Sequence, residues 1–154
     1  MLKKRFSLVM TLLIFLVSST TSLAAAPDLF ENSDQVSYYP LKRNSCLRSC
    51  TLYFALDTPN TSFYEGIVST YHPVDSISAS MEIWSLDDDG FYSLVYIDTH
   101  FASQEDELIF NKLNIRTYPS KYYAALVDCT VMHPECNSTE GISISTKFLR
   151  WFDA

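Results

Sequence analysis

The stretch ISASMEIWSLDDDGFYSLVYIDTHF, residues 77–101, contains the clearest structural signal in the chain. Before residue 85, the apolar residues Ile77, Ala79, Met81 and Ile83 alternate with a second set, which consists of Ser78, Ser80, Glu82 and Trp84. A period of two residues is that of a β-strand with one buried face. Residues 87–90 end in the turn-forming pair Asp89-Gly90 and lead into a second run rich in apolar residues. The stretch therefore predicts a β-hairpin.

The same period recurs before and after this hairpin. We predict further strands over residues 47–56, 63–71, 108–115, 121–132 and 141–152. In three of them the alternation places apolar residues on one face: Cys50, Leu52, Phe54 and Leu56 in the first, Tyr123, Ala125, Val127, Cys129 and Val131 in the fourth, and Ile142, Ile144 and Phe148 in the last. Turn-forming residues such as those at 57–60 separate the strands, and no helical period follows the N-terminal segment.

Seven short strands with short connections predict an all-β domain, a two-sheet antiparallel sandwich. A small closed barrel is the alternative. An α/β layout is excluded, because a crossover between parallel strands needs about a dozen residues, usually in a helix, and the connections are shorter than that.

Residues 47–151 resemble an immunoglobulin-like or fibronectin-type-III-like domain. The stretch YYAALVDC, residues 122–129, is placed like the sixth strand of such folds. The layout is also similar to that of small uncharacterised secreted proteins of Gram-positive bacteria, in which a short Asp-Ile-like link precedes a hairpin, as residues 74–77 do here. The resemblance implies a β-sandwich and no particular activity.

The N-terminal segment has the three parts of a secretory signal peptide. Lys3, Lys4 and Arg5 precede an apolar run over residues 6–17, and small residues follow up to Ala26. The apolar run of about twelve residues spans roughly 18 Å as a helix, which is short against a hydrocarbon core of about 30 Å. We predict a cleaved signal peptide over 1–25, an N-terminal extension over 26–45, a sandwich domain over 46–154 and secretion to the extracellular space. An uncleaved N-terminal anchor is the alternative.

The charge of the chain disfavours nucleic acid as a partner. Cleavage after residue 25 removes three of the eleven basic residues and none of the eighteen acidic ones, which changes the net charge from −7 to −10. Nucleic-acid-binding proteins need a basic surface to neutralise phosphates. No second apolar stretch of membrane-spanning length follows, so we expect no stable membrane insertion.

Four cysteines, Cys46, Cys50, Cys129 and Cys136, form an even set in a chain that we expect to be exported, and disulfides persist outside the cell. A bridge between Cys46 and Cys50 is disfavoured unless Cys46 lies in a turn, because an extended strand places their Cα atoms about 13 Å apart and a bridge spans at most about 7 Å. Since the first and sixth predicted strands run antiparallel, we predict the pairs Cys46–Cys136 and Cys50–Cys129. The cysteine spacing is not that of zinc fingers or ribbons.

No catalytic or metal-binding constellation stands out. No Gly-x-Ser-x-Gly motif selects a serine to act with His72, His100 or His133. The acidic turn at 87–89 lacks the twelve-residue pattern of a calcium loop, so we expect no metal and no cofactor. Asn60 and Asn137 match the acceptor pattern for N-glycosylation.

Aromatic residues with outward parity are the remaining functional signal, and Tyr53, Trp84 and Trp151 are the chief ones. Clustered on one sheet face, they would form a contact surface for a protein or a carbohydrate. Our favoured hypothesis is a secreted non-enzymatic binding module whose ligand the sequence does not specify. A small secreted hydrolase with a loop-borne site and an envelope- or stress-associated structural protein are the alternatives.

Overall fold

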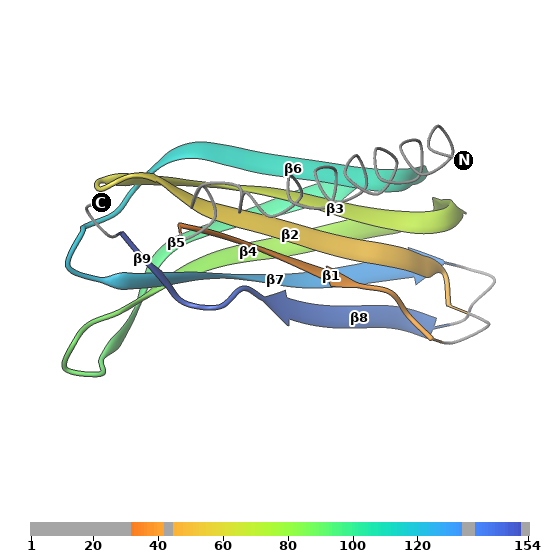
Figure 1. The fold of residues 1–154 in the computed structure, drawn as a ribbon. Coiled ribbons are helices and arrows are strands. Elements are labelled where there is room, and N and C mark those ends of the chain that lie inside the picture. The colour runs from red at the N-terminus through yellow and green to blue at the C-terminus, as the bar shows by residue number, and fades with distance from the viewer. Residues whose placement is uncertain (1–31, 42–44, 134–137, 152–154) are drawn as a thin grey trace, which may run out of the picture.

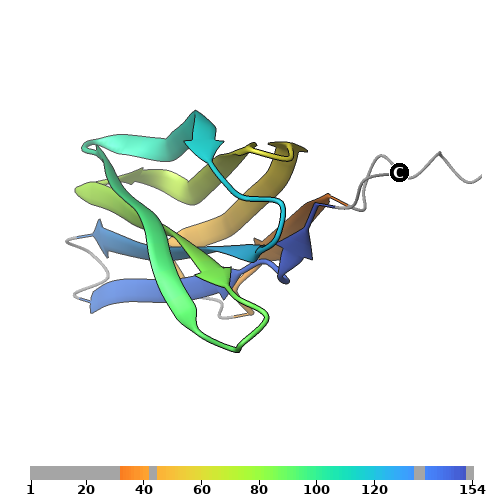
Figure 2. The same cartoon turned by 90° about the vertical axis from the view of Figure 1, so that its left-hand side faces the viewer.

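Two antiparallel β-sheets packed face to face make up the structure, a computed structural model that describes residues 32–41, 45–133 and 138–151 (Figures 1 and 2). The predicted all-β sandwich is therefore confirmed. The strands in chain order are β1 (Ser33–Tyr38), β2 (Leu47–Thr58), β3 (Thr61–Val74), β4 (Ser76–Leu86), β5 (Tyr92–Ala102), β6 (Glu105–Arg116), β7 (Tyr122–His133), β8 (Ser138–Ser145) and β9 (Leu149–Arg150).

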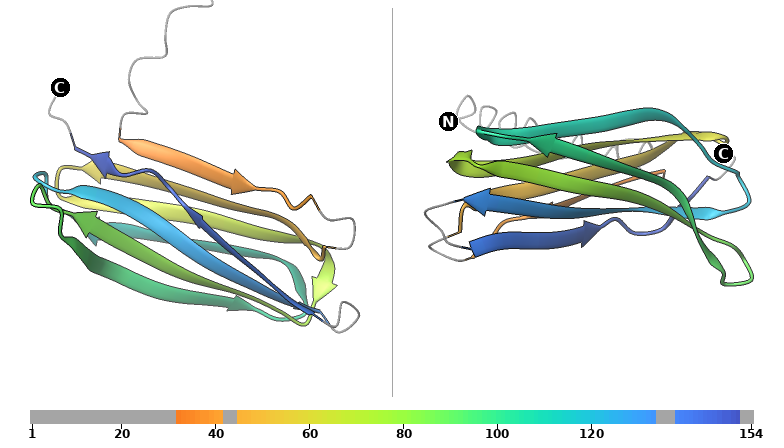
Figure 3. Two further views of the ribbon diagram at one scale, coloured as in Figure 1. Left: turned by 90° about the horizontal axis from the view of Figure 1, so that it is seen from below. Right: turned by 180° about the vertical axis from the view of Figure 1, so that it is seen from behind.

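The chain passes repeatedly from one sheet to the other. The first sheet, called sheet A, has the order β1-β2-β3-β6, and the second, sheet B, has the order β5-β4-β7-β8, with β9 paired to β7. Strands β1 and β8 therefore lie at one lateral edge of the sandwich, and β5 and β6 lie at the other (Figure 3).

The hairpin predicted from residues 77–101 is confirmed as β4 and β5, which pair from Ile77 opposite Ala102 to Leu86 opposite Tyr92. At the turn, the Gly90 amide donates to the Asp87 carbonyl at 2.9 Å. Gly90 has a φ of 83°, a conformation that residues with a Cβ rarely adopt.

The core includes most of the inward positions that the alternation assigned, together with Tyr64 and Val68 of β3 and Phe110 of β6. Phe148, which the alternation placed on the same side as Ile144, is instead 38% exposed. Among the residues with no more than 2% of their surface exposed are Cys50, Leu52, Phe54, Ile77, Ala79, Met81, Ile83, Tyr123, Ala125, Val127, Cys129 and Val131. Each buried aliphatic or aromatic side chain contributes about 1.5 to 3 kcal/mol, so these strands hold the two sheets together. In sheet A, Gly66 lies under Phe110, and a Cβ at this position would overlap the phenyl ring.

The structure differs from the predicted strands at both ends. Strand β1 lies within the segment assigned to an N-terminal extension, and it pairs with β2 along its whole length. It escaped prediction because only Val36 gives its interior an aliphatic signal. The predicted last strand is divided into β8 and β9, where Thr146 turns inward and exchanges hydrogen bonds with Ala125.

Hydrogen bonds close the edge formed by β1 and β8. The Glu140 carboxylate on β8 accepts hydrogen bonds from the Ser45 hydroxyl at 2.6 Å and from the amides of Cys46 and Leu47 at 3.0 and 3.1 Å. Beyond the end of β8, the Lys147 amide donates to the Asp34 carboxylate on β1 at 2.8 Å. The start of β2 is thus tied to the opposite sheet, and β1 is tied through Asp34 to the segment that follows β8.

The predicted signal peptide and Cys136 lie outside the described residues. Within the described part of the chain, no helix has the length and apolar character needed to cross a bilayer.

Candidate interaction surface

The outer face of sheet B carries apolar side chains in adjacent rows across three strands. Strand β4 lies between β5 and β7, so each of its outward residues has a neighbour on both sides. Trp84 lies opposite Leu94 on β5 and Ala124 on β7, and Glu82 in the next outward row lies between Ile97 and Leu126. Cross-strand neighbours at these positions are close enough for direct side-chain contact.

Several of these apolar side chains are open to solvent. Tyr92 is 63% exposed, Leu94 47% and Ile97 57%. The ring of Phe148, which precedes β9, packs against Tyr92 with 5.8 Å between centroids. We call the resulting surface the sheet-B patch, and its members are Trp84, Tyr92, Leu94, Ile97, Leu126 and Phe148. Contiguous exposed apolar surface of this kind is typical of contact sites.

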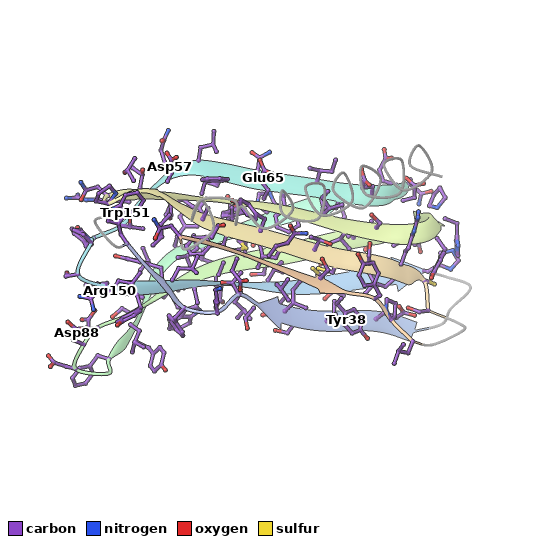
Figure 4. The ribbon with its side chains drawn as sticks, in the orientation of Figure 1. Tyr38, Asp57, Glu65, Asp88, Arg150 and Trp151 are labelled. Atoms are coloured by element: carbon purple, nitrogen blue, oxygen red, sulfur yellow. The ribbon has the colours of Figure 1, made fainter. Side chains whose placement is uncertain are left out.

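Polar contacts hold the aromatic residues in and beside the patch. The indole nitrogen of Trp84 donates to the Glu82 carboxylate at 2.7 Å, which fixes the half-buried ring. At the end of the patch the guanidinium of Arg150 lies 5.0 Å from the centre of the Tyr122 ring and 3.4 Å from the Asp88 carboxylate (Figure 4). Aromatic residues and arginine are the types most enriched at the energetic centres of protein interfaces.

The three aromatic residues singled out from the sequence do not share one surface. Trp84 lies in the sheet-B patch, whereas Tyr53 lies on the outer face of sheet A against Phe63, with 5.7 Å between ring centroids. Trp151 follows β9 and packs against the core. The neighbours that complete the patch on β5 were missed, because a bulge between Ile83 and Trp84 shifts the register of β5 by one residue.

Among the three histidines, His100 has a carboxylate within reach. Its Nε2 lies 3.0 Å from the Tyr64 hydroxyl and 3.8 Å from the Asp98 carboxylate. Asp98 also accepts a hydrogen bond from the Tyr96 hydroxyl at 2.7 Å, the main reason why the pKa of Asp98 lies below its usual value. Burial is the main reason why the pKa of Tyr64 is raised, and the neighbouring Tyr96 phenol and Asp98 carboxylate raise it further.

This arrangement does not form the serine-based site that the hydrolase alternative requires. The hydroxyl that contacts His100 belongs to Tyr64, which is completely buried and whose raised pKa keeps it protonated. A nucleophile needs access to its substrate and activation by a base. In the described residues the polar contacts of His100 are with Tyr64 and Asp98, on the β5–β6 side of the core.

His72 and His133 meet at the opposite end of the strands, with 4.6 Å between ring centroids. Together with the sulfur of Cys46 they place three potential ligand atoms within 4.8 Å of one another. Cys46, however, is disulfide-bonded, and the ligand that metals prefer is a free thiolate. Sequence reasoning missed this cluster, because only the pairing of the sheets brings residues 46, 72 and 133 together.

Cys50 on β2 and Cys129 on β7 face each other across the sandwich, as the predicted pairing requires. Their sulfur atoms are 3.3 Å apart and not bonded in this structure, since a disulfide bond is about 2.05 Å long. The contact lowers the pKa of Cys50, while the same contact and burial raise the pKa of Cys129. Cys136 lies outside the described residues, so its pairing with Cys46 stays a prediction.

Two of the three aspartates in the acidic turn are paired with cations. Lys121 lies 2.8 Å from Asp87, and Arg150 lies 3.4 Å from Asp88. These carboxylates therefore do not converge on one point, as calcium ligands do. Asn60 is exposed at the turn between β2 and β3, and Asn137 lies outside the described residues.

The chain matches no protein-family model and no curated protein sequence.

Proposed function

We propose that this protein is a secreted, non-enzymatic binding module that acts through the sheet-B patch. The observation that carries the proposal is the continuity of the patch: apolar residues from β4, β5 and β7 occupy neighbouring positions, and Trp84 lies at their centre. Exposed tyrosine, leucine and isoleucine side chains on an ordered sheet lose little conformational entropy when a partner covers them, so such a surface is suited to binding.

The partner that fits this surface is a basic protein. The patch contains Glu82 and is bordered by Asp128 and by Asp88, which is paired with Arg150. The whole chain has a net charge of −7. Apolar centres with charged rims are characteristic of protein–protein interfaces. A second copy of this chain would bring like charges together, whereas a basic partner would be attracted by the same charges.

Export and covalent cross-linking belong to the same proposal. Residues 1–25 act as a cleaved signal peptide, and the oxidising environment outside the cell joins Cys46 to Cys136 and Cys50 to Cys129. The position of Cys50 opposite Cys129 supports the second bridge.

We further propose that the sandwich is immunoglobulin-like or fibronectin-type-III-like and similar to small secreted proteins of Gram-positive bacteria. When β2 is taken as the first strand of such a fold, the first, second and fifth strands share sheet A, and the third, sixth and seventh share sheet B. For these six strands the distribution is that of immunoglobulin-like sandwiches, which supports the proposed topology. The fourth strand, β5, lies in sheet B and not beside the first, second and fifth strands as in the constant-type arrangement.

The test uses the processed protein, an array of purified extracellular proteins and a glycan array. We expect binding to one or a few basic proteins, weakened by raised salt. Changing Trp84→Ala or Ile97→Lys lowers the affinity at least about tenfold, as expected for a residue at the centre of an interface.

The matched control is Ile109→Lys, which places the same charge on the outer face of sheet A at a residue that is 62% exposed. This variant retains the affinity of the unmodified protein. Binding to glycans alone, an absence of binding on both arrays, or an equal loss in Ile109→Lys would refute the proposal.

A further inference from the structure

A cleft of about 410 Å³ lies between the edges of β5 and β6. Its walls include Val95 and Tyr96 from β5, Lys112, Asn114 and Arg116 from β6, and Tyr118 from the segment that follows. Figure 3 (right) shows β5 and β6 close together at the link between them and farther apart toward the start of β5 and the end of β6, where these residues lie. The cleft is separate from the sheet-B patch. It lies between the edges of the two sheets, whereas the patch residues Leu94 and Ile97 lie on the outer face of sheet B.

A bulge in each of the two edge strands accounts for the cleft. On β5, Val95 is an extra residue between Tyr96 opposite Ile83 and Leu94 opposite Trp84. On β6 the register shifts between Lys112 and Ile115, and Asn114 within this interval has a φ of 58°. Bulges bend and twist a strand locally, so two bulges facing each other separate the edges and turn their side chains into the space between them.

The cleft carries the positive charge of Lys112 and Arg116. In the described part of the chain, the lysine and arginine residues that form ion pairs are Lys121, with Asp87, and Arg150, with Asp88. Neither Lys112 nor Arg116 forms such a pair. The Arg116 guanidinium lies over the Tyr118 ring at 5.2 Å. Lys112 does act electrostatically on Asp98, but that carboxylate is hydrogen-bonded to Tyr96 and to the Thr99 amide.

We propose that this cleft binds a small organic anion, a ring-bearing carboxylate whose charge lies between Lys112 and Arg116. A guanidinium presents two parallel donors that match a carboxylate, and a lysine adds a point charge with rotatable donors. The rings of Tyr96 and Tyr118 offer flat apolar surface for the body of the ligand. The volume lies within the range of about 300 to 1,000 Å³ that is typical of small-molecule sites.

The positive charge of the cleft is also distinctive because the molecule around it is acidic. With a net charge of −7, the surface repels small anions at long range, and this repulsion is screened by salt. Binding in the cleft must therefore come from short-range contacts with Lys112 and Arg116. Raised salt weakens these contacts less than it weakens the long-range repulsion. This site does not depend on the proposed protein partner.

The experiment titrates the processed protein with benzoate and glucuronate, followed by nuclear magnetic resonance of backbone amides. The two anions distinguish an aromatic ring from a sugar ring, and benzyl alcohol, glucose and inorganic sulfate are the comparison probes. We expect at least one of the two carboxylates to bind saturably and to shift the amide signals of Tyr96, Asn114 and Tyr118, while the neutral analogues produce no such shifts.

The double variant Lys112→Gln with Arg116→Gln weakens that binding at least about tenfold. The control is Arg48→Gln with Lys147→Gln, which removes the same charge from two exposed residues outside the cleft and keeps the affinity of the unmodified protein. Circular dichroism checks that both double variants are folded.

Four results would overturn the proposal. The first is that neither benzoate nor glucuronate binds saturably. The second and third are that the neutral analogues, or sulfate, bind as tightly as the carboxylates. The fourth is that the control double variant loses as much affinity as the double variant in the cleft. Each is independent of whether Ile97→Lys affects a protein partner.

Discussion

The two lateral edges of the sandwich are built differently. At the edge formed by β1 and β8, the Glu140 and Asp34 carboxylates accept backbone hydrogen bonds from the opposite sheet or its flanking segment. At the edge formed by β5 and β6, bulges separate the strands, and Tyr96 lines the cleft between them. We call the first edge closed and the second, which holds the cleft, open, although Tyr64 of sheet A and His100 of sheet B are hydrogen-bonded on that side.

This difference indicates where the molecule has room for a ligand. A closed edge uses its polar groups to hold the sheets in register, so they are not available for recognition. The open edge leaves two cations and two tyrosine rings beside water, and the sheet-B patch begins on the other side of the same strand. Loops and irregular edges carried by a rigid scaffold are common places for binding sites.

The largest expected effect concerns the sulfur pair beside the closed edge. Oxidation of Cys50 and Cys129 would close a loop of 79 residues, which is worth about 4 kcal/mol in the chain-entropy model. We therefore expect the oxidised protein to be about 4 kcal/mol more stable than the double variant Cys50→Ala with Cys129→Ala. Urea denaturation measures the difference, and peptide mapping without reductant identifies the bridge. Two free thiols at these positions in exported protein would contradict the prediction.

A smaller effect compares the edges directly. Glu140→Ala removes the acceptor of three hydrogen bonds at the closed edge, and we expect a loss of about 2 to 3 kcal/mol, since hydrogen bonds to a charged group are worth about 1.5 to 3 kcal/mol each and the freed amides regain some water contacts. Lys112→Ala at the open edge should change the stability by less than about 0.5 kcal/mol. Similar losses for the two variants in urea denaturation would show that the edges do not differ in this way.

The smallest effect is a change in the response to alkaline pH at the open side. Burial raises the pKa of Tyr64, so the folded state favours the protonated phenol. The stability that depends on this proton is complete below the ordinary tyrosine pKa of about 10 and decreases as the pH rises above it. Tyr64→Phe should be about 1 kcal/mol less stable at neutral pH because it loses the bond to His100.

Above the ordinary tyrosine pKa, the difference between the Tyr64→Phe variant and the unmodified protein should become smaller. Burial also raises the pKa values of Tyr96 and Tyr123, so the variant retains part of the alkaline sensitivity. Parallel stability curves from neutral to strongly alkaline pH would show that Tyr64 does not contribute to it.

Much of the interior could be predicted because alternation is a local property. The inward positions of Cys50, Met81 and Val127 follow from a period of two residues, and the approach of Cys50 to Cys129 follows from the antiparallel direction of two strands. The candidate surfaces could not be predicted in the same way. The sequence pointed to Trp84 but also to Tyr53 and Trp151, which lie on other parts of the molecule.

The amino-acid sequence by itself determined the strands from β2 to β7, most of their inward positions and the turn at Gly90, because each depends on neighbouring residues and on the conformation of one backbone position. Only the tertiary structure decided which outward residues lie together, since a single extra residue such as Val95 shifts every later pair on its strand. That register determines the sheet-B patch, the cleft beside Lys112 and the hydrogen bonds that Glu140 accepts. Register is set by pairing between distant segments, so no local pattern in the chain specifies it.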